Sequence, residues 1–166
     1  YCLVPDSGKL KWVYSVDGGF KDSTTPVVVS PNQVLVQTAK HGLQLLKINH
    51  QEEPRVQVLW ENHRIKGSYC SPIVHQDYIY CYSGRFLTCL SLQTGKINWK
   101  SRNPGEGFII IVDNHLLLLT KRGTLSIAET NPKLYQEKAS LDLFNELAWS
   151  YPSFYKGSIY ARNYGE

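Results

Sequence analysis

Residues 70–99 read CSPIVHQDYIYCYSGRFLTCLSLQTGKINW, and this stretch decides the fold. A Ser-Pro pair leads into a short apolar run, and a polar turn separates it from a second run at residues 78–81. A Ser-Gly-Arg turn at residues 83–85 opens a third run, and Thr-Gly-Lys at residues 94–96 precedes a final run that ends on Trp99. Short apolar runs between turn residues predict four antiparallel strands.

Looser copies of this stretch lie on both sides of it. Residues 3–12, LVPDSGKLKW, match residues 90–99 at Leu, at Ser/Thr-Gly-Lys and at Trp. Trp12 and Trp60 are 48 residues apart, and Trp60 and Trp99 are 39 residues apart. Periods near 40 residues with four short strands each indicate β-propeller blades. The copies predict a blade tail at 1–12, blades at 25–60, 70–99 and 108–138, and the start of a blade at 151–166.

The composition agrees with a sheet-rich protein and excludes several other classes. Hydrophobic residues make up 42% and charged residues 19% of the 166 residues, which is not a disordered composition. Eleven Tyr and four Trp favour strands. The net charge of +4 is spread without a run of Lys and Arg, so no nucleic-acid partner is expected. No apolar stretch approaches the roughly 20 residues that span a bilayer.

The Thr-Gly-x-x-x-Trp ending, together with the Ser-Pro entry, resembles the pyrroloquinoline-quinone (PQQ) repeat family. This resemblance implies an all-β propeller, of which the chain holds about four blades truncated at both ends, while the intact protein has seven or eight. The structural residues of the blade motif are then Gly8, Trp12, Trp60, Gly95 and Trp99. Each Trp offers a flat surface that can pack onto the next blade, and each Gly gives the turn its backbone freedom.

The PQQ-repeat family holds both enzymes and non-enzymatic propellers. Its quinoprotein dehydrogenases bind PQQ on the axis with calcium, an Asp base and a vicinal disulfide, whereas the lipoprotein of the bacterial outer-membrane protein assembly machine is not an enzyme. No Cys-Cys pair occurs here, and Val4 and Ser91 replace the Asp that often supports the family's Trp turn. The resemblance therefore favours a periplasmic or extracellular protein-interaction scaffold with no catalytic, cofactor or metal residues. The alternative is a fragment of a PQQ-dependent dehydrogenase that uses PQQ and calcium.

The four cysteines are predicted to be structural. Their spacing matches no zinc motif. Cys2 and Cys89 occupy the same position of the repeat, which indicates a site for a small apolar side chain. A hairpin turn at residues 76–77 would leave Cys70 only diagonal to Cys81, an unfavourable geometry for a disulfide. We expect buried free thiols.

Three histidines and two connecting segments complete the local predictions. His41, His75 and His115 each lie at or beside a predicted turn, so we expect exposed turn residues rather than metal ligands. Residues 13–23, which include two adjacent glycines, are predicted to form a connection. Residues 141–149 are predicted to form a short helical turn inside a loop.

The candidate docking surface is built from arginines and tyrosines. Arg85, Arg122 and Arg162 recur at or just after the predicted turn between the second and third strands, and Tyr82 lies beside the first of them. We predict that these four residues belong to an aromatic, Arg-bearing face that docks a protein or a glycan. The alternative is that the tyrosines fill the wedge between blades. The other expected partners are the remaining blades, because an isolated piece would leave blade faces and strand edges bare and would not be a well-behaved monomer.

Overall fold

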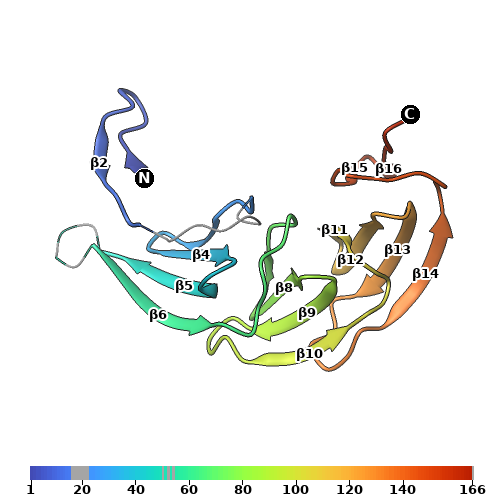
Figure 1. The fold of residues 1–166 in the computed structure, drawn as a ribbon, viewed down its shortest axis with the longest axis horizontal. Helices are drawn as coiled ribbons and strands as arrows, with labels where there is room; N and C mark the ends of the chain where they lie inside the picture. Colours follow the sequence, from blue (N-terminus) through green and yellow to red (C-terminus); the bar gives the residue numbers. More distant parts are fainter. Residues whose placement is uncertain (16–22, 50, 52, 54, 166) are drawn as a thin grey trace.

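The computed structural model describes residues 1–15, 23–49, 51, 53 and 55–165. All sixteen regular elements in this part of the chain are β-strands. They form three four-stranded and two two-stranded antiparallel sheets. Figure 1 shows that the sheets follow one another along an open arc, with the two termini at its opposite ends. The predicted all-β propeller architecture is confirmed. No helix in the described residues is long and apolar enough to cross a membrane.

Each four-stranded sheet is one blade, with its strands side by side in chain order. The first blade consists of β3 (Val27–Ser30), β4 (Gln33–Thr38), β5 (Gly42–Ile48) and β6 (Val56–Asn62). The second consists of β7 (Ile73–His75), β8 (Tyr78–Ser83), β9 (Phe86–Ser91) and β10 (Ile97–Ser101). The third consists of β11 (Gly107–Val112), β12 (His115–Thr120), β13 (Thr124–Glu129) and β14 (Glu137–Asp142). The two-stranded sheets pair β1 (Cys2–Leu3) with β2 (Leu10–Trp12), and β15 (Ser153–Tyr155) with β16 (Ser158–Tyr160).

Two local predictions differ from the structure. The third blade extends to Asp142, beyond the predicted end at residue 138, because the longer turn at residues 130–136 moves its last strand along the chain. The predicted helical turn at 141–149 is wrong, since residues 141–142 end β14 and the remainder is a loop. Of the predicted connection at 13–23, residues 16–22 lie outside the described part of the chain.

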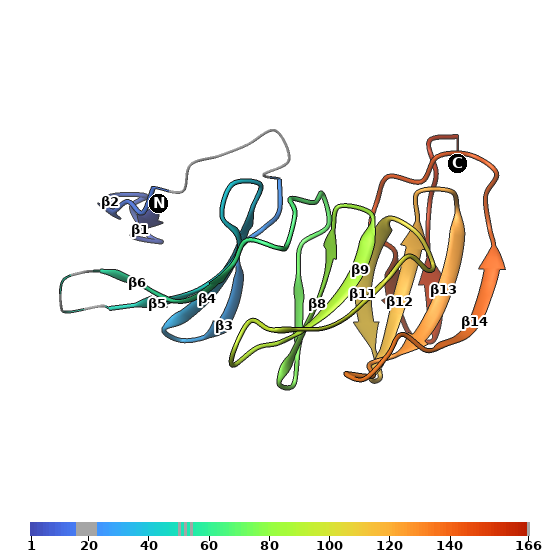
Figure 2. The same cartoon turned by 60° about the horizontal axis from the view of Figure 1, so that its bottom comes forward.

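The blades stack in the order of the sequence. The first strands of neighbouring blades contact one another, β3 with β7 and β7 with β11, and therefore line the inside of the arc. The last strands β6, β10 and β14 lie on its outside (Figure 1). Figure 2 shows the three sheets standing face to face, as propeller blades do.

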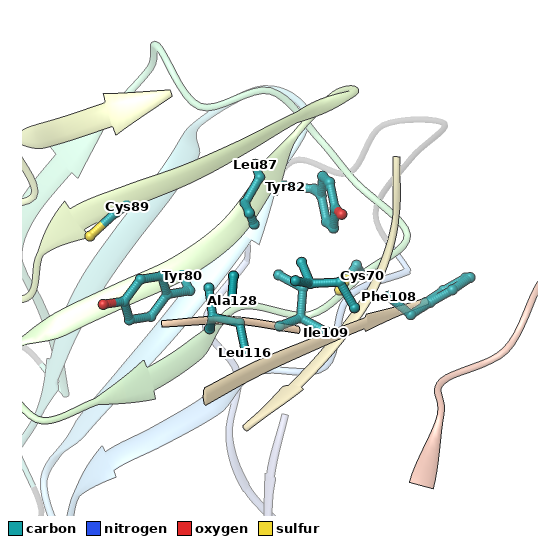
Figure 3. Packing of buried hydrophobic residues seen from close by; sticks show 10 residues of the cluster. Cys70, Tyr80, Tyr82, Leu87, Cys89, Phe108, Ile109, Leu116 and Ala128 are labelled. Carbon is teal, nitrogen blue, oxygen red and sulfur yellow. The ribbon is translucent and has the colours of Figure 1, made fainter. Parts of the chain in front are cut away.

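The alternation of side chains along β8 joins the second blade to both of its neighbours. Tyr80 and Tyr82 lie in the core shared with the third blade, where Figure 3 shows Tyr80 beside Ala128. Ile79 and Cys81 lie in the core shared with the first blade. A strand that is buried on both faces carries apolar side chains at every position, which explains the unbroken apolar run in this segment.

The antiparallel order of the strands places different loops at the two ends of each blade. Turns between the second and third strands lie at the same end as the segments that connect consecutive blades. We call this end the connection face. It comprises residues 38–42, 61–72, 83–86, 100–107, 120–124 and 142–152. The turns between first and second strands and between third and fourth strands form the opposite face.

Blade junctions and a candidate docking cleft

The Thr-Gly turn and the Trp of the repeat motif meet across neighbouring blades. A Cβ atom placed on Gly95 would lie 2.4 Å from Cε3 of Trp60, so the indole rests directly on the glycine backbone. Nε1 of Trp60 donates a hydrogen bond to the Leu92 carbonyl at 2.9 Å, and Nδ2 of Asn62 donates to the Gly95 carbonyl at 2.7 Å. Gly95 itself has φ +65° and is buried. The Trp of the first blade and the Thr-Gly turn of the second blade therefore join these two blades.

The same junction recurs between the second and third blades with different residues. Nε1 of Trp99 donates to the Asn131 carbonyl at 2.9 Å, and Nδ2 of Asn98 donates to the Pro132 carbonyl at 3.2 Å. The ring of Trp99 also lies 6.2 Å from the ring of Tyr135. The Asn-Pro turn supplies the accepting carbonyls although it has no glycine, so the hydrogen bonds depend on the backbone of the turn.

The two remaining motif residues, Gly8 and Trp12, lie in the β1–β2 sheet. Trp12 pairs with Cys2, as Trp99 pairs with Cys89 in the second blade. Gly8 has φ +65°, as Gly95 has, but a Cβ atom there would meet nothing within 4 Å. The pairing of each cysteine with the Trp of its own sheet explains why Cys2 and Cys89 occupy the same position of the repeat.

All four cysteines are free thiols, as predicted. Cys70 and Cys89 lie in the core between the second and third blades, whereas Cys81 lies on the other face of the second blade, so Cys70 and Cys81 cannot pair. Burial raises the pKa of the Cys70 thiol to about 11 and that of Cys89 to about 12. Cys2 departs from the prediction because it is only half-buried, since β1 belongs to a two-stranded sheet.

A cleft on the connection face brings together arginines from three segments. Arg85 lies in the β8–β9 turn, Arg122 in the β12–β13 turn, and Arg102 in the segment that follows β10. We call this hollow the basic cleft; its volume is about 540 Å³. It is lined by Arg85, Arg102, Pro104, Gly105, Glu106, Thr120, Lys121, Arg122 and Thr124.

Lys121 differs from the arginines because it is held by its own chain. Its ammonium group pairs with the Glu106 carboxylate and lies 4.0 Å from the ring centroid of Trp149 and 5.2 Å from that of Tyr69. Only 17% of its side chain is exposed. A cation between aromatic faces is favourably placed, so this lysine fixes the connecting segments of the third blade.

The three arginines of the basic cleft are exposed and carry no ion pair within the described residues. The guanidinium of Arg102 lies 5.7 Å from the ring centroid of Phe86, which orients it without neutralising its charge. Arg85 and Arg122 extend from the tips of two turns. The basic cleft therefore presents three guanidinium groups to solvent.

The surrounding connection face is also predominantly basic. Its positively charged residues are Lys40, Arg64, Lys66, Arg85, Lys100, Arg102, Lys121 and Arg122. Its negatively charged residues are Glu61, Glu106, Asp142 and Glu146. In these described ranges basic residues outnumber acidic ones by eight to four, which favours a positive potential around the cleft.

The structure contradicts one member of the predicted docking surface and places another outside the basic cleft. Tyr82 is fully buried, so its assignment to a surface is wrong; its hydroxyl donates to the Gly105 carbonyl at 2.7 Å and thereby supports the cleft wall from behind. Burial raises its pKa well above the ordinary value. Arg162 lies beyond β16, is exposed and does not line the basic cleft. The sequence-based prediction did not include Arg102. The one feature of the sequence that could have indicated it is its position just after the strand that contains Trp99.

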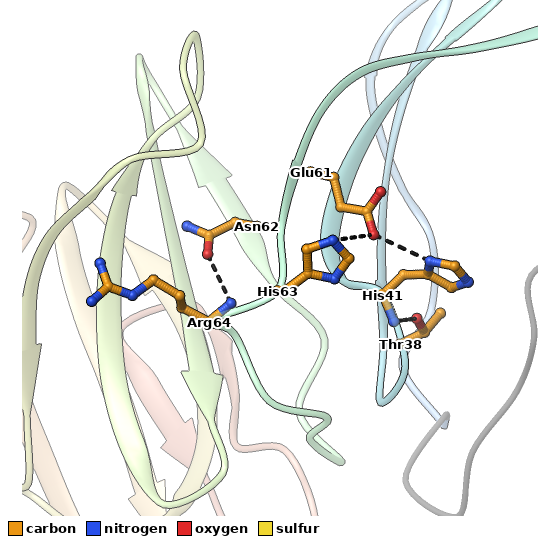
Figure 4. A network of polar contacts seen from close by, with 6 residues as sticks. All are labelled: Thr38, His41, Glu61, Asn62, His63 and Arg64. Atoms are coloured by element: carbon orange, nitrogen blue, oxygen red, sulfur yellow. Dashed lines mark hydrogen bonds and ion pairs between the residues drawn. The ribbon is translucent and has the colours of Figure 1, made fainter.

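A second polar cluster lies on the same face, where the first blade connects to the second. Figure 4 shows Oε1 of Glu61 between two imidazoles, 3.1 Å from Nδ1 of His41 and 3.2 Å from Nε2 of His63. Within the described residues, no three His, Cys, Asp or Glu side chains are arranged to hold a metal ion. Of the three turn histidines, His115 is exposed as predicted, whereas His41 and His75 are half-buried.

The fold and the junctions define the chain as part of a β-propeller built from PQQ-type blades. A family model described as outer membrane protein assembly factor BamB matches residues 1–101. The chain belongs to this family.

Two solved structures show the same fold. BamB from Moraxella catarrhalis superposes with a TM-score of 0.53 at 13% identity, covering 97% of this chain and 60% of the BamB chain. The N-terminal domain of Nup159 superposes with a TM-score of 0.54 at 15% identity, covering 83% of this chain and 35% of that one. The chain thus spans 60% of the length of the BamB structure. No curated protein matches the sequence.

Proposed function

We propose that the chain is part of a non-catalytic propeller that acts as a docking platform for another protein. The observation that carries this proposal is the convergence of Arg85, Arg102 and Arg122, from three segments, on one cleft without an ion pair in the described part of the chain. Arginine is enriched at protein interfaces relative to the rest of a protein surface. A guanidinium group carries five donors, which can bind a partner's acceptor groups.

Family membership supports the same proposal at a coarser level. The matching family model is described as an outer membrane protein assembly factor, and by that likeness we assign the partner to protein assembly outside the cytoplasm. The remaining blades of the same propeller are the second proposed contact. Exposed apolar side chains at both ends of the arc, such as Leu3 and Tyr155, fit blades stacked on either side. The proposal assigns the chain no PQQ and no calcium.

A photo-crosslinking experiment tests the docking function. A crosslinking amino acid is placed at position 85 of the intact protein in its native cells, and a matched variant carries it at position 133, an exposed lysine on the opposite face. We expect a discrete crosslinked partner from position 85 alone. Equal crosslinking from both positions, or none from position 85, would show that the connection face is not the docking face.

A second measurement tests the catalytic alternative. The intact protein is incubated with PQQ and calcium, and the reduction of an electron-accepting dye is followed with a panel of alcohols. We expect no reduction above the rate with PQQ and calcium alone. A PQQ-dependent rate that requires the protein would establish a dehydrogenase and overturn the non-catalytic assignment.

A further inference from the structure

We infer that the basic cleft binds an acidic peptide segment of the docked protein, rich in Asp and Glu; this inference rests on the proposed docking function and names the chemistry of its partner. Three features of the cleft support this assignment. They are the arrangement of its arginines, the pairing of the carboxylates around it, and its concave shape.

The arginines are suited to several carboxylates rather than to one. Arg85 and Arg122 belong to different blades, and Arg102 lies in the segment that joins those blades. A guanidinium group matches a carboxylate through two parallel hydrogen bonds. Three such groups spread around about 540 Å³ therefore fit a chain that carries carboxylates at intervals.

The carboxylates near the cleft do not neutralise the arginines. Among the described residues that line the cleft, Glu106 alone is acidic, and its carboxylate pairs with Lys121. Asp142 lies nearby and accepts a hydrogen bond from the Thr124 hydroxyl at 2.8 Å. The charge of the three arginines is left for a partner, and electrostatic complementarity of this kind sets specificity and association rate.

The shape of the cleft favours a peptide over the other large anions. The backbone of Pro104 and Gly105 forms one wall, and the hydroxyl of Tyr82 holds that wall in place from the core. A flat lipid surface cannot enter a concave site, and a nucleic-acid duplex needs basic residues along an extended backbone. An extended peptide can enter the hollow and bring its side chains to each arginine.

A direct binding assay tests the inference. The intact protein is titrated with a fluorescent peptide that alternates Glu and Gly, and anisotropy reports binding; a peptide with Gln in place of Glu is the uncharged control. We expect binding of the Glu peptide only, weaker at higher salt. The double variant R85A/R122A should weaken it by about tenfold or more. The matched variant K133A/R162A, which loses the same charge outside the cleft, should bind as the wild type does.

The outcomes separate this inference from the proposed function. Equal binding of the Glu and Gln peptides, or equal loss in both double variants, overturns the acidic-peptide inference. Binding of a DNA duplex or of vesicles containing anionic phospholipid that depends on Arg85 and Arg122, without peptide binding, also overturns it. If the partner still crosslinks at position 85 in that case, the docking function stands and only the chemistry of the partner is wrong.

Discussion

Replacing Gly95 with alanine tests whether the Thr-Gly turn and the preceding blade's Trp form a structural junction. The added methyl group has two separate costs. Gly95 has φ +65°, and a left-handed backbone costs an alanine about 1–2 kcal/mol. The new Cβ would also lie 2.4 Å from Cε3 of Trp60, and overpacking of this kind costs about 1–3 kcal/mol. We expect the free energy of unfolding to fall by about 2–5 kcal/mol.

A second glycine separates the backbone cost from the junction cost. Gly84 has φ +58° in the β8–β9 turn of the complete second blade. A Cβ atom there meets nothing within 4 Å. G84A should therefore lose only about 1–2 kcal/mol. The excess loss in G95A measures the contact with Trp60.

The assay is equilibrium urea unfolding of the intact protein, followed by far-UV circular dichroism so that Trp60 does not report on itself. A double-mutant cycle with Trp60→Leu completes the test, because the smaller side chain removes the ring from Gly95. In that background G95A should cost no more than G84A does. A cost of G95A equal to that of G84A in the wild-type background, or an excess that persists after Trp60→Leu, would refute the junction.

Three further predictions follow from buried groups. Burial raises the pKa of the Cys70 thiol from 9.0 to about 11, so the unfolded chain loses this proton first and stability falls as pH rises from 9 to 11. Cys70→Ala should make this fall less steep in urea midpoints measured across that range, and the part that remains comes from other buried groups such as Cys89. A thiol reagent at neutral pH should modify Cys70, Cys81 and Cys89 only after unfolding, because all three are buried, and mass spectrometry of the labelled peptides can check this. Tyr82→Phe leaves the Gly105 carbonyl without its donor and should cost about 1 kcal/mol in urea unfolding.

The blade architecture could be predicted from the sequence because its signals are local. Apolar runs of strand length, turns rich in Gly and Asn, and a Trp near every 40 residues are each visible within one repeat. The end of the third blade is predicted less accurately for a related reason. Residues 130–136 replace its Thr-Gly-Lys turn, and without that motif the sequence predicts the last strand of the blade too early in the chain. Residues 141–149 then carried no strand signal strong enough to exclude a helix.

The docking cleft could be predicted only in part, because it depends on distances between blades. Arg85 and Arg122 share a position in the repeat, so sequence comparison alone brings them to the same face. Arg102 belongs to a connecting segment with no counterpart in the motif, and only the stacked blades place it beside them. Tyr82 is wrongly predicted to be on the surface for a different reason. Strand alternation predicts which face of the sheet it lies on, but the sequence of one strand cannot show that the third blade covers that face.

The junctions and the basic cleft are consequences of the same stacking. Trp60 and Trp99 each donate a hydrogen bond to a backbone carbonyl of the next blade, at Leu92 and at Asn131. These bonds help to set how neighbouring blades stack, and the stacking in turn places the turns that carry Arg85 and Arg122. Because the fold positions these turns, the arginines come together without ion pairs in the described part of the chain, and their charge stays available for a partner.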